Sequence, residues 1–409
     1  MEGQGHDWVK SHRADQPIWQ VCEKGGRDVM LEDLMEKKEK KVEYIELIYD
    51  LIFVYIIGRN NSLLHNFSNG FVEFGAFMAY LMTTLAIIQI WNYCSYYINM
   101  YGRNGVRDHV FFFINMFLLY FIGEGTRADW QAYHTQYHLA WALILVNIGM
   151  QYVIEYRNHR DEPEVMRQIR KMAAVIFAEA AVVAADIMVF KTFQTSWLSL
   201  AAILISMAVV TAMGQKRGAG YIDFPHLSER AMLYVVFSFG EMIIAIAAYF
   251  DGAFSCRSTY FALAAFLIVA ALFLSYEVFY DDIIDREKET NGLVYMLLHI
   301  VIIFSMNNIT NGLEFMREEE ISLIPKMVFL IVSFILFFGA LFLIGLGYAK
   351  AKFSKAKALF LYGTTIGIIF AVLMFVFREN MVVNIAMTVV FVYLMFLMIF
   401  RYGDRIRNM

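Results

Sequence analysis

The chain has 409 residues, of which 59% are hydrophobic and only 18% are charged, and its formal net charge is −4. Soluble domains are about 45–50% apolar, so this composition excludes a large soluble domain and indicates a polytopic membrane protein. The sequence contains no HExxH, P-loop, GxSxG or CxxC motif and no basic patch interleaved with aromatic residues. Enzymes that depend on these motifs are therefore not expected, and neither is nucleic-acid binding.

Residues 1–42 form a mostly polar segment ahead of the first long apolar run. They contain no short apolar stretch followed by a small-residue cleavage site, so we expect a cytoplasmic tail and no secretory signal. Residues 402–409 are again polar, and we expect a second cytoplasmic tail there.

About twelve apolar segments reach the roughly 17–25 residues needed to cross the hydrocarbon of a bilayer. The predicted spans are 43–63, 71–97, 106–124, 134–156, 170–190, 196–214, 227–249, 259–280, 293–313, 323–347, 357–377 and 381–401. The predicted fold class is therefore an all-α polytopic membrane helix bundle. The segment 215–226 contains glycines and is expected to be a cytoplasmic linker between a first six-helix half, 43–214, and a second, 227–401.

Lysine and arginine gather on alternate loops, a bias that marks cytoplasmic loops. If the N-terminal tail is cytoplasmic, the loops on the other side contain only Arg59, Arg127, Lys191, Arg257, Arg317, Lys326 and Arg378. An odd number of crossings would scramble this bias. We therefore expect an even number of crossings of the cell membrane, with both termini cytoplasmic.

Weak self-similarity between the two halves indicates a duplication, which is a common origin of transporter folds. A shift of about 190 residues aligns His109 with His299 and Glu124 with Glu314. Because each half would contain an even number of crossings, the two copies would be parallel. We predict a six-plus-six parallel repeat.

The first predicted span carries three carboxylates, Glu43, Glu46 and Asp50, and no basic residue among them. At about 100° per residue, all three lie on one side of the helix. A charged acid near the bilayer centre costs at least ~2.5 kcal/mol, and such residues usually mark a functional interior. We therefore predict that this acidic face belongs to the interior of the bundle.

Further acids are predicted deep in later spans. Glu179 and Asp186 share one stripe of the fifth span, and Glu241 lies in the seventh. We expect no lysine or arginine at comparable depth. Such acids can hold protons, because desolvation and like charge favour the neutral form, or they can bind a cation or line water. The alternative is that each acid is protonated and only hydrogen-bonds a neighbouring helix.

Histidines provide a second set of candidates. His299 lies well inside the ninth span, where it could relay a proton, although a lone core histidine is more often simply hydrogen-bonded. His109, His134 and His138 lie near predicted helix ends, where we expect an interfacial position.

Two further clusters have ordinary explanations. The aromatic residues of 91–101 are typical of an interfacial belt, and they could instead wall a pocket between helices. Asp281, Asp282 and Asp285 form a DDxxD string, which in membrane prenyl-transfer enzymes holds a diphosphate through Mg²⁺. No convincing second acidic motif faces it, and Asp282 can form an ordinary i, i+4 pair with Arg286, so no metal site is expected and this string is a weak alternative.

The stretch ELIYDLIFV, from Glu46 to Val54, resembles the ELFFDLVFV signature that opens the bacterial low-temperature-requirement A (LtrA) family of membrane proteins. A second stretch, from His226 to Glu241, is similar to that family's ER…L…GE span. The resemblance covers most of residues 43–310 and implies a polytopic membrane protein. The signature positions that it implies are Glu46, Asp50, Glu229, Arg230, Gly240 and Glu241. It implies no biochemical activity, because the family is named for a growth phenotype.

These features together predict a proton- or cation-coupled secondary transporter, with a site near the midplane formed by the first, fifth, seventh and ninth spans. Asp50 and Glu241 would take and release the coupling proton or monovalent cation, and His299 would relay it. The residues predicted for coupling or substrate binding are Asp50, Glu179, Asp186, Glu241 and His299. The residues predicted to gate or orient on the cytoplasmic side are Glu46, Glu229 and Arg230. No other cofactor is expected.

Two alternatives stay open. A membrane-embedded enzyme acting on lipid or isoprenoid would need bound Mg²⁺ and a second acidic cluster facing 281–285. A channel or membrane sensor, including a cold-adaptation factor, would need a continuous wet path. In every case the expected partners are the lipid bilayer and an unidentified small molecule or ion, and not nucleic acid.

Overall fold

The computed structural model describes residues 40–124, 130–213, 222–250, 255–350 and 356–407. The predicted N-terminal tail lies outside the described residues up to position 39, and the predicted linker does so up to position 221. All the described helices belong to one unit of the chain, Lys41–Met409.

The described residues form twelve α-helices, each of which coincides with one predicted span. They are α2 (Tyr44–Asn60), α3 (Phe74–Tyr101), α4 (Val106–Glu124), α5 (Trp130–Asn158), α6 (Pro163–Phe193), α7 (Trp197–Met213), α8 (Phe224–Ile246), α9 (Cys256–Val278), α10 (Leu293–Phe315), α11 (Leu323–Tyr348), α12 (Ala356–Val376) and α13 (Met381–Arg407). The predicted all-α class is confirmed.

Ten of the described helices are long and apolar enough to cross a membrane, which confirms a multi-pass bundle. The other two, α2 and α7, have 17 residues each. At about 1.5 Å per residue they are roughly 25 Å long, slightly less than the ~30 Å of hydrocarbon in a typical bilayer. A count of twelve crossings therefore stays a prediction.

The α2 helix has one exposed apolar face and one buried acidic face. Ile48 and Leu51 are more than half exposed, at the i, i+3 spacing of one side of a helix. Glu46 and Asp50 are buried on the opposite side, whereas Glu43 precedes the helix as its N-cap. The prediction that the acidic face belongs to the interior is confirmed for Glu46 and Asp50.

A short hairpin connects α2 to α3 and begins after a 3₁₀ turn. Its strands are β1 (Phe67–Ser68) and β2 (Phe71–Val72), which pair antiparallel. Asn69 and Gly70 between them both have positive φ, 53° and 80°, as the two-residue turns of hairpins require. The Gly70 carbonyl accepts the backbone N–H of Ser322 at 2.7 Å, which ties the hairpin to the start of α11. The α3 helix therefore begins at Phe74, slightly after the approximate start predicted for the span at 71–97.

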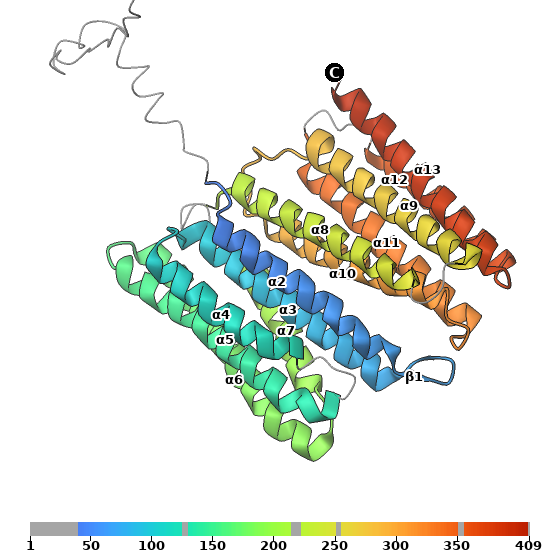
Figure 1. Ribbon diagram of the computed structural model, residues 1–409. Helices are drawn as coiled ribbons and strands as arrows, with labels where there is room; N and C mark the ends of the chain where they lie inside the picture. Colours follow the sequence, from blue (N-terminus) through green and yellow to red (C-terminus); the bar gives the residue numbers. More distant parts are fainter. Residues whose placement is uncertain (1–39, 125–129, 214–221, 251–254, 351–355, 408–409) are drawn as a thin grey trace, which may run out of the picture. The chain divides into compact units, whose positions relative to one another are not determined.

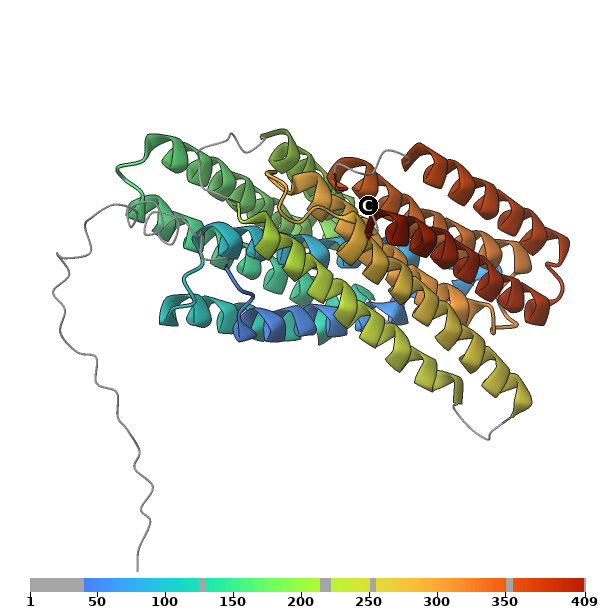
Figure 2. The ribbon, with the colours of Figure 1, turned by 90° about the horizontal axis from the view of Figure 1, so that it is seen from above.

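The helices form two groups that meet along α2 and α8. In the first group, α5 packs against α4 and α6, while α7 packs against α3 and α6. In the second group, α8 contacts α9 and α10, α11 lies between α10 and α12, and α13 contacts α9 and α12. Figures 1 and 2 show α4–α7, in turquoise to yellow-green, on one side and α11–α13, in orange to red, on the other. α2 contacts α3, α4 and α8 and so lies between the groups.

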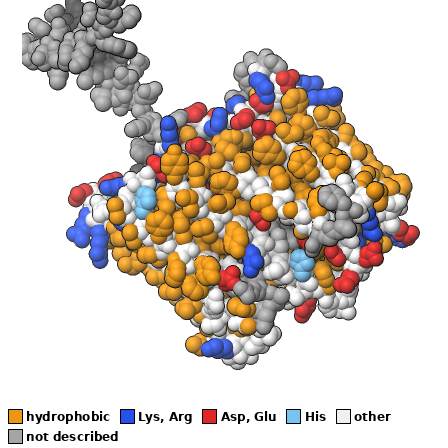
Figure 3. Space-filling view, viewed as in Figure 1, with side chains coloured by type: hydrophobic (Ala, Val, Ile, Leu, Met, Phe, Trp, Pro, Cys, Tyr) orange, Lys and Arg blue, Asp and Glu red, His pale blue; other side chains and the backbone are white. Residues whose placement is uncertain are grey.

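The start of α2 and the end of α13 lie toward the same end of the bundle (Figure 1). We call this the basic end, because the described connections from α3 to α4 and from α5 to α6, which carry Arg103 and Arg160, also lie at this end. Figure 3 shows hydrophobic side chains over much of one face of the bundle, with charged side chains mostly toward its rim. Such a surface is typical of helices that face lipid.

Candidate functional site

Arg230 of α8 lies inside the bundle and binds two carboxylates of α2. Its Nη2 lies 2.8 Å from Asp50 Oδ1, and its Nε donates to Asp50 Oδ2 at 3.2 Å, so this pair is bidentate. Its Nη1 lies 3.0 Å from Glu46 Oε2. All three side chains are almost completely buried. One guanidinium therefore contacts both acids of α2.

Residues from α3 and α8 complete this arrangement. Trp91 donates its indole N–H to Asp50 Oδ1 at 2.9 Å. The Nε2 of His226 lies 3.6 Å from Glu46 Oε1, and its Nδ1 lies 3.0 Å from the side-chain amide of Asn99. The set that we call the Arg230 cluster consists of Glu46, Asp50, Trp91, His226 and Arg230.

The prediction that the buried acids lack a basic residue at their depth is wrong for Glu46 and Asp50. It failed because α8 packs against α2 and brings Arg230 into contact with Asp50 across 180 residues of sequence. Among the described residues, Arg230 forms its ion pairs with these two acids and not with its neighbour Glu229, which is half-buried. Removing one partner of a buried ion pair typically costs about 3–5 kcal/mol, so the cluster holds α2 and α8 together.

Two other predicted site residues have different neighbours. Glu241, half-buried on α8, lies against Gly58 of α2. Its carboxylate occupies the space that a Cβ at position 58 would fill. His299, fully buried on α10, lies 3.0 Å from the Tyr276 hydroxyl through Nε2 and 2.9 Å from the Tyr295 carbonyl through Nδ1. Both ring nitrogens of His299 are thus hydrogen-bonded within the core. The predicted coupling roles of Glu241 and His299 stay predictions.

The α3 helix separates Asp50 from Glu179. Trp91 of α3 contacts Asp50, whereas Gln89 and Tyr93, two positions before and after it, contact Glu179 of α6. Positions two apart on a helix differ by about 200° in direction, so these side chains leave α3 on opposite sides. The predicted single site that unites both carboxylates near the midplane is therefore wrong.

Glu179 is buried among neutral polar groups. The Tyr93 hydroxyl donates to its Oε2 at 2.8 Å, and the Gln89 amide does so at 3.4 Å. Gln89 also donates to Ser206 Oγ of α7 at 2.7 Å. Within the described part of the chain, Glu179 forms no ion pair and its Oε1 makes no hydrogen bond. This is the buried, unneutralised carboxyl that the sequence predicted, in a place separate from Asp50.

Asp186 lies about two turns beyond Glu179 on α6 and faces two histidines of α5. Its Oδ2 lies 3.2 Å from His138 Nε2 and 3.6 Å from His134 Nε2, and it accepts the Ser199 hydroxyl at 2.8 Å. All four side chains are fully buried. The two histidines are buried because the face of α5 that carries them packs against α6. Their predicted interfacial depth stays a prediction.

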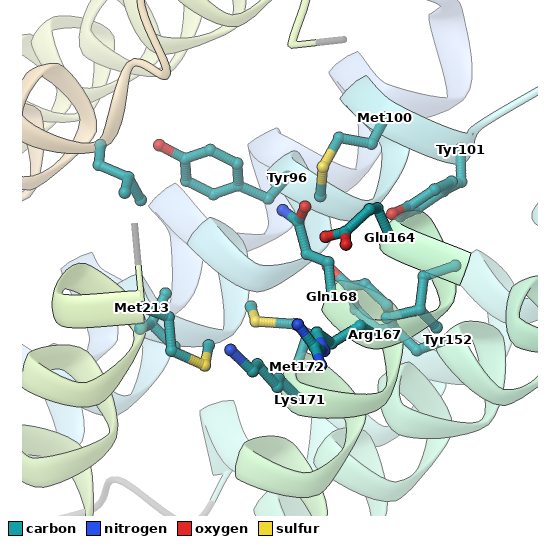
Figure 4. Close-up of a pocket in the computed structure, with 13 residues that line it drawn as sticks. Tyr96, Met100, Tyr101, Tyr152, Glu164, Arg167, Gln168, Lys171, Met172 and Met213 are labelled. Atoms are coloured by element: carbon teal, nitrogen blue, oxygen red, sulfur yellow. The ribbon is translucent and has the colours of Figure 1, made fainter. Parts of the chain in front are cut away.

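Figure 4 shows the lining of a first cavity, of about 100 Å³. It lies toward the basic end, because the end of α3 and the start of α6 contribute to it. Tyr96 and Tyr101 of α3, Tyr152 of α5, and Arg167 and Lys171 of α6 are among its lining residues. The three tyrosines are buried, as is most of the aromatic segment of α3. Tyr96 and Tyr101 thus wall a pocket between helices, which was the alternative interpretation of the segment. The interfacial-belt interpretation of its other aromatic residues stays a prediction.

A second cavity, of about 440 Å³, lies at the opposite end of the same helices. It is formed where α3, α5 and α7 begin and α6 ends, and its lining includes Met82, Trp130, Phe190, Ser196 and Trp197. The four helices α3, α5, α6 and α7 thus contribute to both cavities.

The acidic string at 281–285 has ordinary partners. Asp282 accepts a hydrogen bond from Arg407 Nε at 3.1 Å, in place of the predicted pair with Arg286, whose guanidinium lies over the Tyr280 ring at 5.1 Å. Asp285 accepts the backbone N–H two residues on. Among the described residues these three aspartates do not form a metal-ligating group.

The described helices and the ionisable groups buried among them define a polytopic integral membrane protein. The family described as Bacterial low temperature requirement A protein (LtrA) matches residues 41–399. The chain therefore belongs to the LtrA family. Glu46, Asp50 and Arg230, three of the positions that the sequence resemblance implied, are the acidic and guanidinium members of the Arg230 cluster. No curated protein and no solved structure matches the chain.

Sequence reasoning missed the grouping of His134 and His138 with Asp186, and the role of Gln89 beside Glu179. The histidines did carry a signal, because an i, i+4 spacing places two side chains on one face of a helix. The partner helix could not be read from that spacing. Gln89 carried no signal of its own, since a single amide in an apolar span is ordinary.

Proposed function

We propose that this LtrA-family protein is a proton- or cation-coupled secondary transporter, with a path through the helices α3, α5, α6 and α7. One observation carries the proposal: Glu179, a buried carboxyl without an ion-pair partner among the described residues, lies between two cavities at opposite ends of these helices. An acid in such a place must hold a proton or meet a mobile cation, because a bare buried charge is too costly.

Positions along α6 support this path. Met172 lines the first cavity and lies seven residues before Glu179, while Phe190 lines the second and lies eleven residues after it. At about 1.5 Å per residue, these separations correspond to roughly 10 Å and 16 Å along the helix. Neutral polar groups of Gln89 and Tyr93 surround the carboxyl between the cavities.

The proposal moves the coupling role from Asp50 to Glu179. Asp50 already has a permanent cation, Arg230, at hydrogen-bonding distance, and an acid held in that way is poorly suited to exchange a proton. Glu241 and His299 stay candidates for additional steps. Glu46, Glu229 and Arg230 would act by orienting α2 against α8.

The topology belongs to the same proposal. Twelve crossings would place both chain ends on the cytoplasmic side, as the distribution of lysine and arginine favours. The halves α2–α7 and α8–α13 contain the same number of helices, which supports a six-plus-six parallel repeat.

A flux assay in liposomes tests the proposal. The full chain is reconstituted with a pH-sensitive dye inside, and a pH gradient or a cation gradient is imposed. We expect the parent to move protons, or protons in exchange for Na⁺ or K⁺, faster than empty liposomes. Glu179→Gln should remove this flux while leaving insertion intact, and Glu319→Gln, at a side chain that is 83% exposed, should retain it.

Two results would overturn the proposal. Parental flux in Glu179→Gln would exclude Glu179 as the coupling group. A parent that moves no protons, Na⁺ or K⁺ above the empty-liposome rate under any imposed gradient would exclude coupled transport of these ions.

A further inference from the structure

We propose that His134, His138 and Asp186 form a binding site for a divalent transition-metal ion such as Zn²⁺. Two imidazoles and one carboxylate are a donor set that zinc and its neighbours in the first row prefer. The inference depends on the contacts of these side chains and is independent of the transport proposal.

The sequence and the packing of α5 and α6 build the site together. His134 and His138 are four residues apart on α5, so they share one face of that helix, and their rings stack with centroids 3.7 Å apart. That face packs against α6, which presents Asp186. One potential ligand atom from each of the three residues lies within 4.8 Å of the others.

The atoms around the three residues orient them as metal ligands. The Nδ1 of His138 lies 2.9 Å from the His134 carbonyl oxygen, which can only accept a hydrogen bond, so Nδ1 carries the proton and a neutral ring leaves a lone pair on Nε2. That Nε2 faces Asp186 at 3.2 Å. The Ser199 hydroxyl holds the same carboxylate at 2.8 Å. Histidine with one nitrogen bound to a carbonyl and the other free is the usual form of a metal ligand.

Unsatisfied atoms provide an independent indication of a ligand. His138 Nε2, His134 Nδ1 and Asp186 Oδ1 are inaccessible to solvent and make no hydrogen bond within the described residues. Buried polar atoms nearly always have a partner. A cation coordinated by His138 Nε2 and the Asp186 carboxylate would satisfy two of these three atoms. His134 would be the third ligand through its Nε2, which lies 3.6 Å from Asp186 Oδ2.

The second cavity provides the access route. Ser196 lines this cavity, and its hydroxyl lies 3.0 Å from His134 Nε2. Trp130 and Phe190, also lining residues, pack against the His134 ring with centroids 5.4 Å and 3.6 Å away. An ion that enters from this end thus meets the histidines directly behind the cavity wall. Three protein ligands leave a fourth position for water or a transported group.

Metal titration of the purified full chain, with any affinity tag removed and after chelator treatment, tests the inference. We expect one Zn²⁺ per chain by calorimetry, and one Co²⁺ that gives a visible absorption band typical of nitrogen and oxygen coordination. His138→Gln and Asp186→Asn should each weaken the affinity at least about tenfold. His109→Gln is the matched control, because His109 is a half-buried histidine at a helix start, and it should bind as the parent does.

The same titration distinguishes this site from the transport path. Glu179→Gln, which is expected to stop flux, should keep full metal affinity, so the two proposals fail separately. Bound Zn²⁺ should also raise the Tm of the parent and not that of Asp186→Asn, which keeps the test informative if one variant is poorly folded. A parent that binds neither ion stoichiometrically, or variants at His138 and Asp186 that bind as tightly as the parent, would refute the site.

Discussion

Replacing Arg230 with methionine should be one of the most damaging single substitutions in this protein. The change removes the guanidinium that contacts both Asp50 and Glu46, while Asp50 is 0% and Glu46 2% exposed. Neither acid can turn to water without α2 leaving α8. Removing one partner of such a buried pair typically costs about 3–5 kcal/mol, a large part of the roughly 5–15 kcal/mol that separates folded from unfolded domains.

Related substitutions separate charge from geometry. Arg230→Lys keeps the positive charge and loses the bidentate contact to Asp50, so it should cost about 1.5–3 kcal/mol, as the loss of a charged hydrogen bond does. Asp50→Asn leaves Arg230 paired with Glu46 and should cost less than Arg230→Met. The triple change Arg230→Met, Asp50→Leu and Glu46→Gln removes the uncompensated charges and should recover most of the lost stability.

Unfolding in mixed micelles with rising SDS fraction, followed by tryptophan fluorescence, measures these differences. The matched control is Arg257→Met, because Arg257 and its partner Glu319 are 66% and 83% exposed at 3.5 Å, and an exposed pair contributes about 0–1 kcal/mol. If Arg230→Met stayed within about 1 kcal/mol of the parent, or if the triple change were worse than the single one, the structural role of the Arg230 cluster would be refuted.

Two further predictions concern contacts at the edges of the spans. Gly58→Ala should lower stability by about 1 kcal/mol, because its methyl group would occupy the space of the Glu241 carboxylate, and adding Glu241→Ala should restore the parental value in the same assay. If the stability changes of the two substitutions simply added in the double variant, the proposed contact between Gly58 and Glu241 would be contradicted. The pKa of His65 is raised above 6.5, chiefly by its hydrogen bond to Glu314 at 3.2 Å. The pair should therefore stabilise the fold fully below pH 6.5 and lose this effect as pH rises through the folded-state pKa. The gain should stay under about 1 kcal/mol, since both side chains are partly exposed, and a Tm difference between parent and Glu314→Gln that grows with pH would have the wrong sign.

The helices could be predicted from the sequence because the length of each apolar segment can be read from that segment alone. Each described helix falls on a predicted span, and the deviations lie at the ends. The α6 helix begins at Pro163, well before the predicted 170, because proline is favoured in the first helical turn and the polar turns that follow need no lipid. The hairpin at 67–72 was missed, since its strands are too short to show a period.

The candidate site could be predicted only in its parts. The burial of Glu46 and Asp50 followed from the helical stripe that they share, yet Arg230 reached them through a helix contact that no local pattern contains. Likewise, Glu179 and Asp186 were correctly placed on one stripe of α6, but α3 and α5 decide what surrounds each of them. Pairings between distant segments depend on which helices become neighbours, and spacing along one helix does not encode this.

The guanidinium shared by α2 and α8 also bears on how the molecule could move. α2 comes first in the amino-terminal set of helices and α8 first in the carboxyl-terminal set, so the two sets are clamped at their leading members. The buried contact of Arg230 with Asp50 and Glu46 resists sliding of α2 along α8. Any rotation of one set of helices relative to the other would therefore have to pivot about this contact. The largest excursions are then expected among the helices farthest from that pivot, and a spectroscopic label on α6 should report motion that a label on α2 does not.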